Sequence, residues 1–204
     1  MGILMTNLLS YAASTAPMTG ETENGDQYLV KQSPHSVLIA IADGLGHGEE
    51  ASIAAKKAMQ VLNDTHGESL IDLVHLCHTA LEATRGSVLM LAHTQADCSV
   101  VWLGIGNILG IHWSSKDQGK STLLASQGGV VGFQLPHLRT GQFTAEPGDT
   151  LIFATDGIFE QFIEYQPNPH SSPQVIANHI FKTYRNTNDD ALVLVLRWMT
   201  TYDG

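Results

Sequence analysis

The sequence has little cysteine and no apolar run long enough to cross a membrane. Its two cysteines, Cys77 and Cys98, form no C-x-x-C pair, which argues against zinc and thioredoxin-type sites. We expect both thiols to be reduced and buried, in a cytoplasmic protein. No apolar run approaches the roughly 18 residues of a membrane helix, and the apolar start at residues 1–5 lacks the basic segment of a signal peptide.

Basic residues are also scarce. Lys and Arg total 10 against 20 Asp and Glu, which gives a formal net charge of −10. This balance argues against a nucleic-acid partner, because such partners need clustered Lys and Arg. It suits a protein that binds cations and meets another protein surface. The 204 residues are suited to one domain spanning residues 1–204.

One stretch combines an apolar run, a carboxylate and three glycines. The run from Val37 to Ile41 predicts a buried strand, Asp43 follows it, and glycines stand at 44, 46 and 48 before an Ala-rich helical pattern. Glycine allows a sharp turn and close approach of another group, although a tight turn with an Asp helix cap would look the same. The acid precedes the glycines, so the stretch is not the G-x-G-x-x-G dinucleotide fingerprint.

The same pattern of a carboxylate at a strand end recurs along the chain. A predicted strand ends in Asp156-Gly157, Asp26 precedes the strand that begins near Tyr28, and Asp189-Asp190 precedes the apolar run 191–196. Carboxylate oxygens are the ligands that Mg²⁺ and Mn²⁺ prefer. A paired site of this kind would ionise a water and bind a phosphoryl group.

Taken in order, Asp43-Gly44-Leu45-Gly46-His47-Gly48, Thr155-Asp156-Gly157 and Asp189-Asp190 resemble the motifs of the PP2C-type metal-dependent protein phosphatases, in their SpoIIE-like bacterial branch. The resemblance covers about residues 20–198. It implies an α/β fold, a four-layer αββα sandwich of two antiparallel sheets flanked by helices. It also implies two Mn²⁺ or Mg²⁺ ions, whose ligands would be Asp26, Asp43 as the bridge, the carbonyl of Gly44, Asp156 and Asp189.

The resemblance implies hydrolysis of phosphoserine or phosphothreonine, with Asp43 and Asp156 essential. His47 is a candidate general acid or substrate contact, and equally a solvent-facing residue at a helix start. Short members of the branch without a sensor domain imply a monomer in a bacterial stress pathway, acting on a phosphorylated STAS-domain antagonist or scaffold. Typical members carry an Arg before the first metal turn. Here residues 14–20 contain none, which leaves open what binds the phosphate.

Two other functions compete with the phosphatase interpretation. A haloacid-dehalogenase phosphatase needs a second Asp two residues after the nucleophile, and Leu45 stands there after Asp43. A non-catalytic PP2C-fold binding module that regulates a partner stays open, although the complete carboxylate set argues against it.

The remaining segments complete the prediction. Periodicity predicts helices at 51–63, 69–84 and 172–184, and strands at 3–16, 28–31, 138–144 and in four segments between 87 and 126. We expect those four segments to form one antiparallel meander. Only residues 133–146 separate the metal-proximal segment 127–132 from the strand before Asp156, so we expect a minimal flap. We expect His75 and His78 to lie on the surface.

Overall fold

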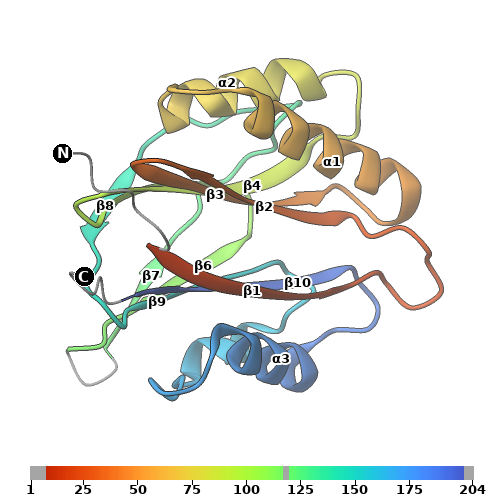
Figure 1. Ribbon diagram of the computed structural model, residues 1–204. Coiled ribbons are helices and arrows are strands. Elements are labelled where there is room, and N and C mark those ends of the chain that lie inside the picture. The colour runs from red at the N-terminus through yellow and green to blue at the C-terminus, as the bar shows by residue number, and fades with distance from the viewer. Residues whose placement is uncertain (1–7, 117–119, 200–204) are drawn as a thin grey trace.

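Two antiparallel sheets stack face to face in the computed structural model, which describes residues 8–116 and 120–199 (Figure 1). One sheet has the order β2-β3-β4-β5-β8, and the other has the order β1-β10-β9-β6-β7. The first comprises β2 (Asp26–Ser33), β3 (Ser36–Gly44), β4 (Ser87–Gln95), β5 (Ser99–Ile105) and β8 (Gly141–Thr144). The second comprises β1 (Leu9–Ala16), β10 (Ala191–Trp198), β9 (Thr150–Ala154), β6 (Leu109–Trp113) and β7 (Ser121–Leu124).

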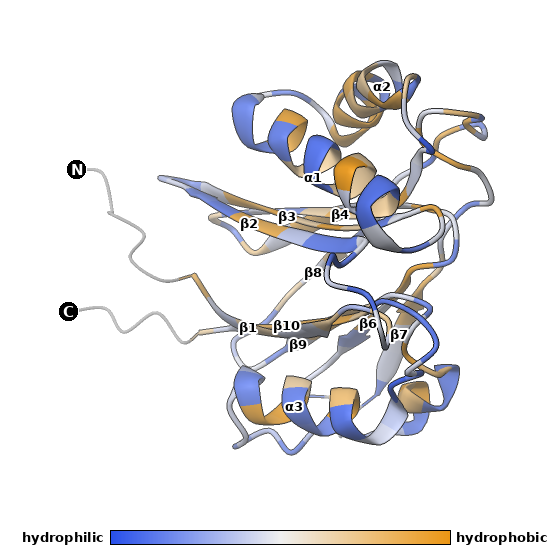
Figure 2. Cartoon of the chain, turned by 90° about the vertical axis from the view of Figure 1, so that its right-hand side faces the viewer, coloured by the Kyte–Doolittle hydropathy of each residue, from blue (hydrophilic) through white to orange (hydrophobic). Residues whose placement is uncertain are grey.

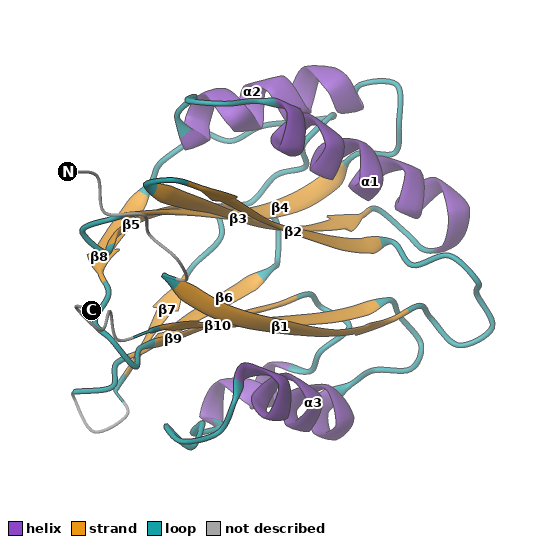
Figure 3. Cartoon of the chain, viewed as in Figure 1, coloured by secondary structure: helices purple, strands orange, loops and turns teal. Residues whose placement is uncertain are grey.

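Helices cover the two outer faces of the stacked sheets. Figure 3 shows α1 (Gly48–Asp64) and α2 (Leu70–Leu81) over the β2-β3-β4-β5-β8 sheet, and α3 (Pro173–Tyr184) under the other sheet. A short 3₁₀ helix, η1 (Glu160–Glu164), precedes α3. The predicted four-layer αββα sandwich is confirmed.

The strand β3 shows why the layers hold together. Its alternate side chains Ile39 and Ile41 pack between the two sheets, while Ala40 and Ala42 pack beneath α1 and α2. All four are fully buried. A strand buried on both faces reads as a continuous apolar run, which is why residues 37–42 predict a strand without polar alternation.

The helices begin where their capping residues indicate. The Ser69 hydroxyl accepts a hydrogen bond from the Asp72 N–H at 3.2 Å, and Ser172 caps α3 with Pro173 in its first turn. In Figure 2, α1 and α3 alternate between hydrophilic and hydrophobic residues along their length, as amphipathic helices do. Within the described residues, no helix has both the length and the apolar character to span a membrane.

The predicted meander is wrong. β4 and β5 belong to one sheet, whereas β6 and β7 belong to the other, where β6 pairs with β9. The chain crosses between the sheets at Gly106, whose φ of 97° suits glycine and whose N–H donates to the Gln127 carbonyl at 2.7 Å. The alternation of side chains within a strand does not record which sheet the strand joins.

Three smaller expectations also need correction. β1 begins at Leu9, and residues 3–7 of the predicted first strand lie outside the described residues. Cys77 is free and buried, and burial raises the pKa of its thiol to about 12, but Cys98 is only half-buried. His75 is exposed as expected, whereas the half-buried His78 ring accepts a hydrogen bond through Nδ1 from the Gly132 N–H at 2.9 Å.

Candidate metal centre

The candidate site lies where strand ends of the two sheets meet. Asp26 and Asp43 are direct partners across β2 and β3 in one sheet. In the other sheet, Asp156 follows β9 and Asp189 precedes the neighbouring strand β10. The Thr155 hydroxyl joins the two sheets by donating to Asp26 Oδ2 at 2.7 Å.

Glycine is needed beside these aspartates because other groups approach the chain there. A Cβ on Gly44 would lie 2.0 Å from the Ala51 carbonyl oxygen, and one on Gly157 would lie 1.8 Å from the Asp190 carbonyl oxygen. Since no Cβ fits at such distances, the start of α1 can pack directly on the end of β3. The Asp-Gly pairs therefore reflect close packing that fixes each carboxylate at the end of its strand.

Three of the four carboxylates border a shared cavity of about 480 Å³, whereas Asp26 is not among its lining residues. Asp43, Asp156 and Asp189 line it together with His47 and Asn107. The His47 side chain is half exposed, and its Nδ1 lies 2.9 Å from Glu21 Oε1. Gly44 ends β3 and is not one of the residues that line the cavity.

The electrostatics of the cavity disfavour charged carboxylates. Burial first, then the charges of the neighbouring aspartates and a hydrogen bond with Asp156, together raise the pKa of Asp43 to about 9. Burial also raises the pKa of Asp26 well above its usual range, and the Thr155 hydroxyl offsets only part of this effect. The pKa of Asp189 is raised by burial and by the charge of Asp156.

The donor set fits a hard divalent cation. The Asp26 Oδ1 atom is buried and has no hydrogen-bond partner among the described residues, and a hydrogen bond between Asp43 and Asp156 requires a proton that a cation would replace. No three His, Cys, Asp or Glu side chains in the described ranges are already arranged around one ion-binding point. Like-charged carboxylates repel one another, so drawing them together requires the cation itself.

Polar residues that the motifs did not assign hold the carboxylates in place. Asn107 Nδ2, in the turn after β5, donates to Asp156 Oδ2 at 2.8 Å. Both carboxylate oxygens of buried Asp190 accept backbone N–H bonds, from Met18 at 2.8 Å and from Gly25 at 3.0 Å. The signals that could have revealed these supports are the Gly-Asn turn and the Thr that precedes Asp156-Gly157.

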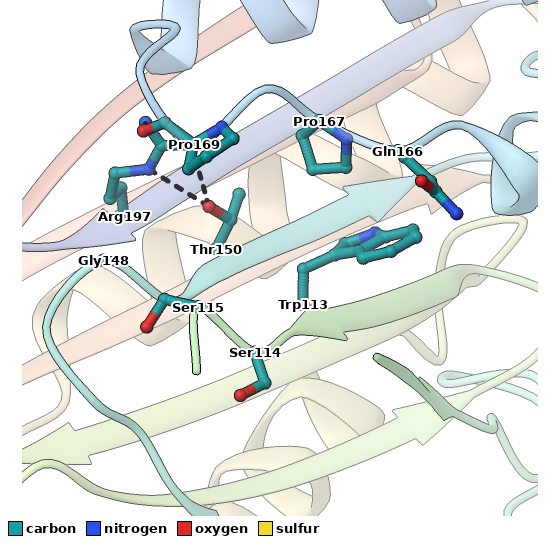
Figure 4. Close-up of a pocket in the computed structure, with 9 residues that line it drawn as sticks. All are labelled: Trp113, Ser114, Ser115, Gly148, Thr150, Gln166, Pro167, Pro169 and Arg197. Carbon is teal, nitrogen blue, oxygen red and sulfur yellow. Dashed lines mark hydrogen bonds between the residues drawn. The ribbon is translucent and has the colours of Figure 1, made fainter. Parts of the chain in front are cut away.

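A second cavity of about 250 Å³ lies at the opposite end of β9 (Figure 4). Trp113, Thr150 and the loop prolines Pro167 and Pro169 line it, and no carboxylate does. Arg197 also lines this cavity, and its guanidinium donates hydrogen bonds to the Thr150 hydroxyl and to the Pro169 carbonyl of the loop. Since Arg197 is engaged in holding this loop, the acidic cavity is the better candidate for chemistry.

Comparisons with known proteins agree with this geometry. The family model of stage II sporulation protein E (SpoIIE) matches residues 33–199. The phosphoserine phosphatase RsbX of Bacillus subtilis (strain 168) is 24% identical over 180 residues, which cover 87% of this chain and 88% of RsbX.

Two solved structures are similar over nearly the whole chain. One, from work on the bacterial stressosome, has a TM-score of 0.85 at 28% identity and covers 93% of this chain and 99% of its own. RsbX in complex with magnesium has a TM-score of 0.82 at 20% identity, with 93% and 95% covered. With its motifs, its αββα sandwich and the match over residues 33–199, the chain belongs to the SpoIIE family of PP2C-type phosphatases.

Proposed function

We propose that this protein is a metal-dependent phosphoserine/phosphothreonine protein phosphatase that acts as RsbX does. The observation that carries the proposal is the acidic cavity, in which Asp43, Asp156 and Asp189 from the ends of two sheets come together. Burial and the neighbouring carboxylates raise the pKa of Asp43 to about 9, as expected of a buried acidic cluster that a cation would neutralise. Membership of the SpoIIE family and the likeness to a phosphoserine phosphatase support the same reaction.

The proposed ligands hold two Mn²⁺ or Mg²⁺ ions. The residues that would hold them are Asp26, Asp43, Asp156, Asp189 and the carbonyl of Gly44. When bound, ions of this kind supply a hydroxide nucleophile at neutral pH and offset the charge of phosphoryl oxygens.

The remaining residues of the site orient these groups. Asn107 and Thr155 each donate to one carboxylate, Asp156 and Asp26 respectively, so each side chain keeps a fixed direction. His47 lies at the cavity wall with its Nδ1 held by Glu21. From there its ring can contact the substrate or give a proton to the departing serine or threonine oxygen.

The proposed substrate is a phosphorylated STAS-domain antagonist or scaffold in a bacterial stress pathway of the partner-switching type. The likeness to RsbX and to a structure from the stressosome supports this class of partner. We further propose that the enzyme acts as a monomer. A non-catalytic binding module would have no need of the complete carboxylate set with its supporting donors, and the described residues offer no observation that favours it.

The test is hydrolysis of p-nitrophenyl phosphate by the purified protein with and without Mn²⁺. We expect turnover that EDTA abolishes and that Mn²⁺ or Mg²⁺ restores. The Asp43→Asn variant, which removes the charge and keeps the size of the side chain, should be inactive at every metal concentration. Full activity in EDTA would disprove the metal mechanism.

A further inference from the structure

An arginine lies against the cavity wall without being assigned any role by the motifs. Arg85 stands between α2 and β4, and its Nη1 atom would lie 2.9 Å from a Cβ placed on Gly46, a residue that lines the acidic cavity. Its Nη2 atom forms an ion pair with Glu50 in the first turn of α1. Both side chains of this pair are more than half exposed, so the pair is weak and can exchange partners.

A phosphoryl group that enters the cavity would need a basic side chain such as Arg85 to bind it. The described lining of the cavity includes three aspartates and neither Lys nor Arg, and the whole chain has a net charge of −10. A doubly charged phosphoryl group on a protein surface must approach through this negative field. A guanidinium at the rim can bind phosphoryl oxygens with two parallel N–H bonds, which compact charges cannot do.

An exposed aromatic side chain lies on the same side of the cavity. Phe133 is 81% exposed and belongs to a turn whose preceding residues, 128–130, line the cavity. Val131 forms an antiparallel bridge with Ser87, and Arg85 and Phe133 each stand two residues from that bridge on the same side. The bridge therefore brings the backbone segments that carry Arg85 and Phe133 together beside the cavity.

The turn that carries Phe133 is firmly held. The Phe133 and Gln134 N–H groups both donate to the Val130 carbonyl, at 3.2 and 2.9 Å, and Gly132 is bound to His78. A Cβ on Gly132 would lie 2.7 Å from Leu81 Cβ, so the turn packs directly on α2. A rigid, exposed aromatic side chain beside an active cavity loses little entropy on contact, which is typical of an anchor for a protein partner.

A third apolar side chain continues this surface. Ile53 on α1 is 51% exposed and lines, with Glu50 and Arg85, a shallow cavity of about 310 Å³. Ile53, Arg85 and Phe133 thus come from three separate segments: a helix, a helix–strand loop and a turn. A short flexible peptide cannot meet three such points without a large loss of entropy, whereas a folded surface can.

We propose that Ile53, Arg85 and Phe133 form a docking surface for a folded phosphoprotein, the substrate of the proposed phosphatase reaction on which this inference rests. Arg85 releases Glu50 and binds the oxygens of the phosphoryl group as it enters the acidic cavity. Phe133 and Ile53 bury against apolar side chains that flank the phosphorylated residue. The metal cavity performs hydrolysis, and this surface determines which proteins reach it.

The experiment compares a small substrate with a folded one. Steady-state kinetics with Mn²⁺ are measured on p-nitrophenyl phosphate and on a STAS-domain protein of the source organism, phosphorylated by its kinase. Phe133→Ala should lower kcat/KM for the phosphoprotein about tenfold and leave p-nitrophenyl phosphate turnover unchanged. Arg85→Ala should raise KM for the phosphoprotein and the inhibition constant of inorganic phosphate about tenfold. Arg85→Lys should restore part of the loss, with an unchanged Mn²⁺ requirement.

Two variants far from the rim serve as matched controls. Lys116→Ala removes a cation from another exposed ion pair, with Glu146, and Leu123→Ala removes a half-exposed apolar side chain on β7. Both should behave as wild type on both substrates. All the altered side chains are about half exposed or more, so thermal unfolding should remain unchanged.

Several results would overturn the docking surface. Equal losses on both substrates in Phe133→Ala would mean that the turn only shapes the metal cavity. Unchanged phosphate inhibition in Arg85→Ala would remove Arg85 from phosphoryl binding. Equal turnover of the intact phosphoprotein and its denatured phosphopeptide would exclude docking, and a dimer that Phe133→Ala dissociates would assign the surface to a second copy of the chain. Absence of any Mn²⁺-dependent turnover by wild type would overturn the phosphatase assignment as well.

Discussion

Replacing Thr155 by valine tests whether the hydrogen bond between the sheets holds the site together. The buried Thr155 hydroxyl donates to Asp26 Oδ2 at 2.7 Å and accepts from the Leu192 N–H at 2.9 Å. Valine keeps the branched shape and removes both bonds. A buried N–H left without a partner costs about 1–3 kcal/mol, and a bond to a carboxyl contributes about 1.5–3 kcal/mol. Because both groups are buried, we expect the two losses to add to about 2.5–6 kcal/mol.

A matched control is available in the same fold. Thr94 on β4 is fully buried, but its hydroxyl has no hydrogen-bond partner among the described residues. Thr94→Val should therefore be neutral or stabilising, since burying an unpaired hydroxyl is unfavourable.

The assay is urea unfolding in EDTA, followed by tryptophan fluorescence. We expect the Thr155→Val midpoint to fall well below that of Thr94→Val, with unchanged m-values. In Mn²⁺, Thr155→Val should also need about 10–100-fold more metal for half-maximal activity, because Asp26 loses the donor that orients it. Free energies of unfolding for the two variants within about 0.5 kcal/mol of each other would refute the reasoning, because surface-like changes fall within that range.

Three further predictions follow from the same geometry. Asp43→Asn or Asp156→Asn should lower turnover at least about 100-fold with the fold intact, and wild-type turnover in either variant would remove that residue from the site. Asp189→Ala should lose activity without losing stability. Asp190→Ala should lose stability, because Asp190 accepts hydrogen bonds from the Met18 and Gly25 amides. The reverse pattern would exchange the two roles. Burial alone would raise the pKa of Asp149, but hydrogen bonds from His112, Ser115 and the Glu146 amide outweigh it and lower that pKa. The Asp149 carboxylate therefore stabilises the fold above its usual pKa of about 3.9, and this stabilisation is lost as the pH falls through the lowered pKa of the folded state. The difference in urea midpoint between wild type and Asp149→Asn should therefore close on acidification below about pH 4.

The positions of the site residues could largely be predicted from the sequence. Asp43 and Asp156 stand where an apolar run stops, and Asp26 and Asp189 stand just before one. The structure places each within two residues of a strand terminus. The glycine after Asp43 or Asp156 indicated close approach of another group, and the structure identifies that group as the Ala51 or Asp190 backbone. The convergence of the four carboxylates did not follow from these patterns. It came from the resemblance to a family, since spacing along a chain does not specify which sheet edges meet.

Other features depend on contacts between distant segments and left no local signal. Residues 98–104 and 107–113 look like two adjacent strands of a meander, yet they lie in different sheets, and Gly104 and Gly106 between them bond to the distant Gln127. Arg85 is an ordinary exposed residue after a helix until Gly46 is found beneath its guanidinium. Asn107 belongs to a plain turn until its amide is seen to hold Asp156. Each role is set by a partner at least 20 positions away in the sequence.

The fold places several carboxyl groups where their charged forms are unfavourable, and it is stable enough to do so. Burial and mutual repulsion raise the pKa of Asp43 to about 9, and Asp26 Oδ1 is buried without a partner. Three apolar layers, one between the sheets and one under each set of helices, supply the offsetting free energy. The unfavourable electrostatic free energy is concentrated in carboxyl groups that a divalent cation would neutralise. The arrangement that destabilises the metal-free fold therefore raises the affinity of the site for a cation. This explains why the carboxylates lie at strand ends. The core anchors β2, β3, β9 and β10 along their length, so their ends can keep the carboxylates near one another for a cation to draw together.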